Sequence, residues 1–229
     1  MSEWINTFFG NGMAEQYLDA VLVTLKITVL GTLFAYIIGI PLGVVLYGTS
    51  KGSIFQNRAI NSVVGVIVNI IRSIPFIILL VMIQPVAKVV VGSRIGDNAF
   101  IFYLTVAAAP FVARMIESSF KEVDAGVIEA AQSMGSNNFQ IITKVLIPEA
   151  KPSLIVGSAI AITTILGYTP MTYLIAGGGL GAMAIQYGLY RFEDEIMYIS
   201  SILLVILVQI MQESLSALAR KGDKRIRNK

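Results

Sequence analysis

Few residue types in this chain could take part in covalent chemistry. The 229-residue sequence contains no histidine and no cysteine. Their absence excludes a histidine or cysteine nucleophile, a disulfide and the usual zinc sites. No GxxxxGK[ST] phosphate-binding loop occurs either, so the chain by itself cannot hold ATP in the familiar way. We therefore expect no catalytic residue, no cofactor and no metal, and we interpret the chain as a non-enzymatic protein.

A glycine string is the one feature that resembles a phosphate-binding loop. It consists of Gly177, Gly178, Gly179 and Gly181. No Lys-Ser or Lys-Thr follows it, as a phosphate loop requires. We favour a tight re-entrant turn or a close contact between helices, both of which need residues without a side chain.

One charged residue lies inside a long apolar stretch. Arg72 occurs in the segment NIIRSIPF, next to Ser73 and Pro75. An isolated charge at membrane depth costs at least about 2.5 kcal/mol. Pro75 removes a backbone donor, and irregular backbone at that depth is tolerated only inside protein or beside a water-filled cavity. We predict that this segment faces a translocation path or a partner helix, with structural pairing of Arg72 as the alternative.

A second unusual stretch runs from Gly167 to Tyr173. It combines Tyr168, Met171 and Tyr173 with two threonines and Pro170. Such a mixture suits the lining of a passage for a small, partly apolar solute. Helix–helix packing is the alternative interpretation. We expect Pro170 to bend this helix.

Composition places these residues in a membrane protein. The chain is 55% hydrophobic and 14% charged, with a mean hydropathy of +0.76, whereas soluble domains average about 25% charged residues. Apolar stretches of roughly 20 residues predict membrane-spanning helices. The fold class is therefore all-α, a polytopic helical bundle in one transmembrane domain over 1–229. The predicted spans are about 20–48, 59–92, 97–119, 150–176 and 194–219, with six spans as the alternative and a kink or break near 72–75.

Basic residues predict the orientation of these spans. Lys and Arg prefer the cytoplasmic side. Only Glu3, Glu15 and Asp19 carry charge before the first span, whereas the loop around Lys51 and the tail are basic. The pattern indicates an N-terminus outside and a C-terminus in the cytoplasm, and no cleaved signal peptide is evident. Membrane orientation explains the basic tail, so we expect no nucleic-acid partner.

A short polar helix-turn-helix interrupts the apolar runs at 124–148, which we call the coupling segment. Asp124 can cap its first helix, and Gly135 stands where a helix ends in a left-handed residue. Ser136 or Asn137 can cap a second helix, which Pro148 should break or kink. We predict a cytoplasmic docking element for another protein; an ordinary structured loop is the alternative.

These residues resemble the signature of ATP-binding-cassette importer permeases. The signature is formed by Glu129-Ala130-Ala131, Gly135 and Pro148, with Ile147 where leucine is common. The segments NIIRSIPFIILL, LTVAAAPFVARMIESS and AGGGLG are similar to methionine importer permeases, and the resemblance covers about 20–215. It implies five spans, a homodimer, a cytoplasmic ATPase dimer that hydrolyses ATP, an extracytoplasmic substrate-binding protein and a bacterial inner membrane. It also implies that Glu129, Ala130, Ala131, Gly135 and Pro148 couple the chain to the ATPase, with helix 125–134 in a groove of that partner.

One segment departs from the family pattern. At 169–176 this chain has TPMTYLIA where the family has a run of small residues. The resemblance implies methionine or a related amino acid as the substrate, and the departure leaves a different amino acid or small solute as the alternative. An ion-coupled secondary transporter and a membrane scaffold are further alternatives. The first of these often shows inverted repeats and carboxylates within its spans, and we find neither pattern in the sequence.

Overall fold

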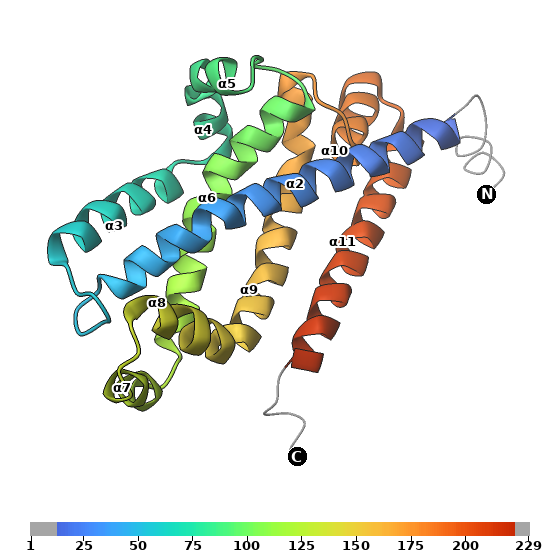
Figure 1. The fold of residues 1–229 in the computed structure, drawn as a ribbon. Helices are drawn as coiled ribbons and strands as arrows, with labels where there is room; N and C mark the ends of the chain where they lie inside the picture. Colours follow the sequence, from blue (N-terminus) through green and yellow to red (C-terminus); the bar gives the residue numbers. More distant parts are fainter. Residues whose placement is uncertain (1–12, 223–229) are drawn as a thin grey trace. The chain divides into compact units, whose positions relative to one another are not determined.

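The computed structural model describes residues 13–222, and every regular element in this range is helical (Figure 1). The α-helices are α2 (Met13–Gly48), α3 (Arg58–Ser73), α4 (Phe76–Met82), α5 (Gln84–Val90), α6 (Asp97–Lys121), α7 (Ala125–Ser133), α8 (Asn138–Gln140), α9 (Ile147–Tyr168), α10 (Leu180–Met183) and α11 (Asp194–Gly222). Two π-helical stretches, η1 (Ile141–Leu146) and η3 (Ala184–Leu189), and one 3-10 helix, η2 (Thr169–Ile175), continue them. Glu3 and the basic residues beyond 222, which support the predicted orientation, lie outside the described residues.

The membrane-spanning helices agree with the predicted count. Four stretches of the described chain are long and apolar enough to cross a bilayer: Met13–Gly48, Asp97–Lys121, Asn138–Ile175 and Asp194–Ser214. A fifth candidate is the pair α3 and α4, which is bent by 106° at a short break. Counting this pair as one span confirms the prediction of five spans. The helix that holds the fourth candidate span is longer than the predicted span of about 150–176, because it already starts at residue 138.

The break between α3 and α4 lies where the sequence predicts it. Pro75 has no backbone N–H, and a residue before proline is disfavoured in helical conformation. Ile74 accordingly adopts an extended conformation, with φ −83° and ψ 124°. The hydroxyl of Ser73 donates a hydrogen bond of 2.8 Å to the Asn69 carbonyl. This bond returns to the carbonyl four residues back, a common arrangement for serine in a helix.

The described chain divides into two compact units. Unit 1 comprises 13–33, Pro75–Val106 and Ile162–Gln212, and unit 2 comprises Phe34–Ile74, Ala107–Ala161 and the end of α11. The division passes through α2, α6, α9 and α11. Each of these helices therefore contributes one part to each unit.

In unit 2, glycines allow α2 to pack closely against α6. A Cβ atom at Gly39 would lie 2.6 Å from Cγ1 of Val112, and one at Gly43 would lie 2.7 Å from Cβ of Ile116. Small residues at such positions permit close helix approach within membranes. Nearby, Leu46 of α2, Val68 of α3 and Ala113 of α6 form a buried apolar cluster. Three helices thus meet in this unit.

Candidate functional site

The first half of the coupling segment is a capped helix. The Asp124 side chain precedes α7 and accepts a hydrogen bond of 2.7 Å from the Gly126 amide. At the other end, Gly135 has a φ of +80°. The Gly135 amide donates to the Gln132 carbonyl at 2.9 Å, and the Ser136 amide donates to the Ala131 carbonyl at 3.1 Å. This pair of bonds is the Schellman ending, which confirms the left-handed role predicted for Gly135.

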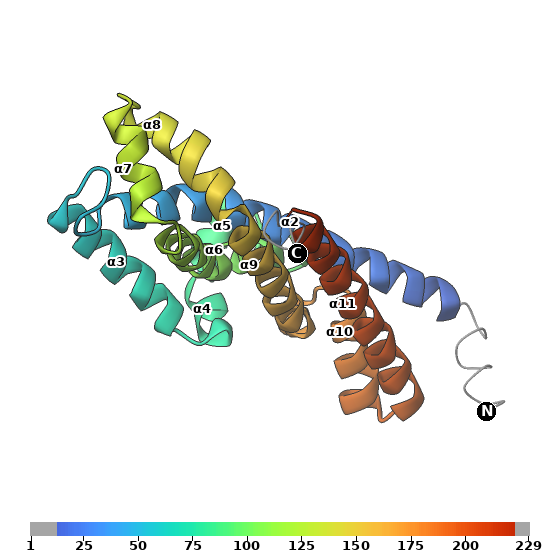
Figure 2. The ribbon, with the colours of Figure 1, turned by 90° about the horizontal axis from the view of Figure 1, so that it is seen from below.

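A reciprocal cap starts the second half. The Asn137 side chain accepts a hydrogen bond of 2.9 Å from the Gln140 amide, and the Gln140 side chain accepts one of 2.9 Å from the Asn137 amide. Of the two predicted caps, the structure therefore uses Asn137. Figure 2 shows α7 leading out and α8 returning beside it. α7 also contacts η1, which continues directly from α8, so the two arms of the turn pack against each other.

Pro148 does not break the helix, so of the two effects predicted for it, a break or a kink, the break is wrong. The helix continues from Asn138 to Ile175, and Pro148 is the second residue of α9. Proline removes one amide donor and its ring clashes with the preceding turn of an α-helix. Here the preceding turn is the π-helical η1, and the Ile147 amide donates to the Ile142 carbonyl five residues back. The wider π-helical turn accommodates the proline without ending the helix.

The surface of the coupling segment is partly apolar. Met134 is 79% exposed and Phe139 is 73% exposed, and Glu129 and Ala130 are also exposed. Sequence reasoning missed Met134 and Phe139, although apolar residues flanking a polar turn were a visible signal. Large exposed apolar side chains commonly mark interaction sites. Ala131 is only 3% exposed, so Ala130 is the alanine of the pair that lies on the surface.

The predicted path residues fall in both units. Arg72 and Ser73 are exposed at the end of α3 in unit 2. In unit 1, Tyr168 stacks on Phe76 with ring centroids 4.6 Å apart, directly after Pro75. Phe76 also contacts Phe100 edge-on at 5.7 Å. The structure thus brings Tyr168 to the start of α4.

The other two predicted path residues lie in η2. Met171 is half-buried, and Tyr173 stacks on Tyr190 with ring centroids 5.1 Å apart. Sequence analysis did not identify Tyr190, because no local pattern links residues on either side of the glycine string. The α-helix ends at Tyr168 and tightens into η2 around Pro170. The expected bend at Pro170 is therefore a change of helix type.

The glycine string forms a tight turn, as predicted. The Gly178 amide donates to Oδ1 of Asp97 at 2.9 Å, and the Leu180 amide donates to Oγ1 of Thr24 at 2.9 Å. Gly179 has a φ of +102°. A Cβ atom at Gly181 would lie 2.5 Å from Cα of Pro170. Backbone conformation at Gly179 and close packing at Gly181 thus explain why these positions are glycine.

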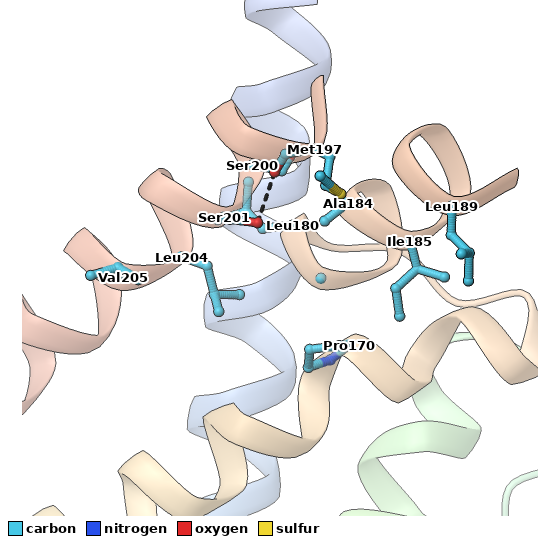
Figure 3. Close-up of a pocket in the computed structure, with 11 residues that line it drawn as sticks. Pro170, Leu180, Ala184, Ile185, Leu189, Met197, Ser200, Ser201, Leu204 and Val205 are labelled. Carbon is cyan, nitrogen blue, oxygen red and sulfur yellow. Dashed lines mark hydrogen bonds between the residues drawn. The ribbon is translucent and has the colours of Figure 1, made fainter. Parts of the chain in front are cut away.

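An apolar cavity of about 370 Å³ lies beside this turn in unit 1 (Figure 3). Its lining includes Pro170, Leu180, Met197 and Leu204, together with the hydroxyl residues Ser200 and Ser201. The Ser201 hydroxyl donates to the Met197 carbonyl at 2.7 Å. The buried Ser200 hydroxyl has no hydrogen-bond partner among the described residues. Mostly apolar pockets of this size with a few polar groups are typical of small-molecule sites.

Metal binding is not supported in the described part of the chain. No group of three or more Asp, Glu, His or Cys side chains there could hold a metal ion. The sites with functional character are therefore the coupling segment and the cavity of unit 1.

Comparison with known proteins places the chain in a transport family. Residues 39–228 match the family described as the binding-protein-dependent transport system inner membrane component. The chain belongs to this family. As an inner-membrane component of such a system, it is a multi-pass membrane protein, and the coupling segment lies inside the matched residues.

Individual relatives carry more specific names. The chain is 45% identical over 212 residues to the probable D-methionine transport system permease protein MetI of Vibrio cholerae serotype O1, covering 93% of this chain and 94% of the relative. It is 43% identical over 167 residues to the methionine import system permease protein MetP of Bacillus subtilis, covering 73% and 75% of the two chains. Among solved structures, a chain of the MetNI methionine ABC transporter in inward-facing conformations superposes with a TM-score of 0.92, at 41% identity over 94% of this chain and 100% of that chain.

Proposed function

We propose that this chain is the membrane permease subunit of an ATP-driven methionine importer. The observation that carries the proposal is the 45% identity to a probable D-methionine permease over 93% of this chain. The alternative of a permease for a different amino acid rests on the departure at 169–176. An ion-coupled transporter acting alone has no support from the family to which the chain belongs.

The permease works with other proteins in this proposal. The sequence lacks a phosphate-binding loop, so ATP hydrolysis belongs to a separate cytoplasmic ATPase dimer. An ATPase dimer binds nucleotide at two sites and offers two docking grooves. Two copies of this chain supply two coupling segments, which supports a homodimer. A substrate-binding protein delivers the solute on the outer side, where the N-terminus lies, and the C-terminus lies in the cytoplasm of a bacterial cell.

The coupling segment docks on the ATPase through α7 and the turn that follows it. Ala130 permits close approach, and Glu129 is exposed and free to pair with a basic side chain of the partner. Met134 and Phe139 supply apolar contact area next to these residues. Gly135 and Asn137 fix the turn that presents them, and Pro148 lies where the segment joins α9. Buried apolar anchors surrounded by polar contacts are typical of energetically important interface residues.

The solute path includes residues of unit 1. The cavity beside η2 and α11 has an apolar lining, the thioether of Met197 and one unpartnered hydroxyl. These groups suit a solute with an unbranched apolar side chain and a few polar groups. Tyr168, Met171 and Tyr173 lie on the elements that lead to this cavity, and Pro75 precedes the ring on which Tyr168 stacks. Arg72 and Ser73 are exposed at the end of α3, and in this proposal they also belong to the path.

Transport proceeds by alternating access. ATP binding closes the ATPase dimer and draws the two coupling segments together, which moves the spans between inward-open and outward-open arrangements. The loaded binding protein favours the outward-open state only to the extent that it binds this state more tightly. No covalent step occurs on this chain.

Reconstitution in liposomes tests the proposal. The chain, its ATPase and its binding protein are incorporated together, and uptake of labelled L- and D-methionine is measured with and without ATP. We expect ATP-dependent uptake that excess unlabelled methionine suppresses more strongly than other amino acids do. Stronger suppression by another amino acid would favour the alternative substrate. Uptake driven by an ion gradient without the ATPase would overturn the proposal.

A further inference from the structure

A polar cluster in unit 2 joins α6 to α3. The guanidinium of Arg114 donates through Nη1 to Oε2 of Glu117 at 2.7 Å. Through Nη2 it donates to Oδ1 of Asn69 at 2.9 Å and to the Gly65 carbonyl at 3.2 Å. Asn69 and Gly65 belong to α3, whereas Arg114 and Glu117 belong to α6. We call Arg114, Glu117, Asn69 and Gly65 the polar joint.

The charges of the polar joint are well compensated. The Glu117 side chain is 7% exposed and has a second cation, because Lys121 Nζ lies 2.7 Å from Oε1. The Arg114 side chain is 26% exposed. Buried ion pairs often contribute little net stability, because desolvation offsets the attraction. Stability alone therefore does not explain why α6 carries two cations and a carboxylate in its second half.

The polar joint lies close to the coupling segment along α6. Lys121 is the last residue of α6, and Asp124 caps α7 three positions later. On the other side of the coupling segment, the hydroxyls of Ser119 and Ser153 lie 2.9 Å apart and connect α6 to α9. The helices on the two sides of the coupling segment are thus bonded to each other, and only residues 122 and 123 separate α6 from the Asp124 cap of α7.

Two kinds of contact connect α6 to its neighbours in unit 2. Against α2, Gly39 and Gly43 give a close apolar contact. Against α3, the bonds of Arg114 supplement the apolar contact of Val68 with Ala113. A hydrogen bond is directional and is lost beyond about 3.5 Å. Arg114 therefore provides the directional connection from α6 to α3.

We propose that Arg114 is the positioning residue that transmits movement of the coupling segment to α3, through its bonds to Asn69 and Gly65. This inference rests on the proposed docking of an ATPase on the coupling segment. α3 ends at the break before Pro75, so its displacement changes the backbone at the broken span. The fork of the guanidinium allows one side chain to hold Glu117 and Asn69 at the same time, which a lysine at this position could not do.

Two substitutions remove the connection from opposite ends. Arg114→Lys retains a cation for Glu117 but loses the second arm, and Asn69→Leu removes the acceptor on α3. In the reconstituted complex, we expect each variant to retain ATP hydrolysis while the number of solute molecules transported per ATP falls about fivefold or more. Asn69→Asp keeps an acceptor for Nη2, and we expect this variant to retain coupling.

The matched control is Asn61→Leu. Asn61 also lies on α3, and its amide donates to the Leu46 carbonyl at 2.7 Å and to Thr49 at 3.0 Å, so it links α3 to the end of α2 and not to α6. Loss of this bond removes a comparable polar contact from the same helix. We expect Asn61→Leu to lower thermal stability without changing the transport-to-hydrolysis ratio. An equal loss of this ratio in Asn61→Leu would overturn the specific role of Arg114.

A double substitution provides a second criterion. If Arg114 acts through Asn69, Arg114→Lys combined with Asn69→Leu should be no worse than either change alone, because both remove the same bond. Independent, additive losses would overturn the proposal, as would normal ratios in both single variants. Absence of ATP-driven uptake by the unaltered complex would instead contradict the proposed function, so the two failures are distinguishable.

Discussion

The Gly178 amide donates a hydrogen bond of 2.9 Å to Oδ1 of Asp97, although the two residues lie 81 positions apart. Asp97 is the first residue of α6, where a carboxylate is also favoured by the helix dipole. Thr172 holds the same turn from the other side, because its hydroxyl donates to the Gly178 carbonyl at 2.8 Å. The amide and the carbonyl of Gly178 are thus each bonded to a side chain from a different element.

Replacing Asp97 should loosen this turn. Asp97→Ala removes a charged acceptor, and we expect a loss of about 1–2 kcal/mol in stability. For a chain of this size the corresponding fall in Tm is about 2–4 °C per kcal/mol. Asp97→Asn keeps an oxygen acceptor and should lose less. Thermal unfolding of the purified protein in detergent measures both, and equal Tm values for Asp97→Ala and the unaltered protein would contradict the assigned bond.

Gly135→Val should uncouple transport from hydrolysis. Gly135 has a φ of +80°, and a Cβ atom there would meet no other atom within 4 Å. The cost is therefore conformational, at least about 1–2 kcal/mol for an L-residue in the left-handed region and more for a branched one. Gly135→Asn is the control, because asparagine tolerates this conformation. We expect liposomes with Gly135→Val to hydrolyse ATP but to import little solute, whereas Gly135→Asn transports nearly normally. Normal transport by Gly135→Val would refute the coupling role of the turn.

Phe139→Ala and Met134→Ala should weaken binding of the ATPase. Both side chains are highly exposed, so their truncation should leave the Tm of the isolated permease unchanged. If they anchor the interface, each loss costs more than about 1 kcal/mol, or roughly a fivefold rise in Kd. Val89→Ala is a matched control, since Val89 is 85% exposed on α5 and is not part of the coupling segment. Pull-down of the ATPase with each purified variant measures the effect. If Phe139→Ala and Met134→Ala bind the ATPase as well as Val89→Ala does, neither side chain belongs to the interface.

Ser200→Ala tests the cavity of unit 1. An unpartnered buried hydroxyl is unfavourable, so its removal should raise the stability of the empty protein by about 1 kcal/mol. If the hydroxyl binds the solute, the same change should raise the KM for uptake. Ser201→Ala is the control, because the Ser201 hydroxyl already bonds to the Met197 carbonyl. A higher Tm with an unchanged KM would remove Ser200 from the solute path.

Several local features could be predicted from the sequence because each depends on a few neighbouring residues. Pro75 determines the break after α3, since it lacks an amide donor and restricts Ile74. Gly135 and Asn137 determine the turn of the coupling segment through a left-handed conformation and a side-chain cap. Pro148 is the instructive exception: its effect depends on the type of helix before it, and the π-helical η1 absorbs a proline that an ordinary α-helix would not.

Sequence alone determined the helical class and the turn chemistry of the coupling segment, because hydropathy and backbone preference act over short distances. Only the tertiary structure decided which residues meet across helices. It paired Arg114 with Asn69, 45 positions away, and Thr24 with the Leu180 amide, 156 positions away. It also buried Ala131 while exposing Ala130 and Phe139. These outcomes depend on how whole helices pack, because a side chain's partners are set by the neighbouring helix face and not by its own segment.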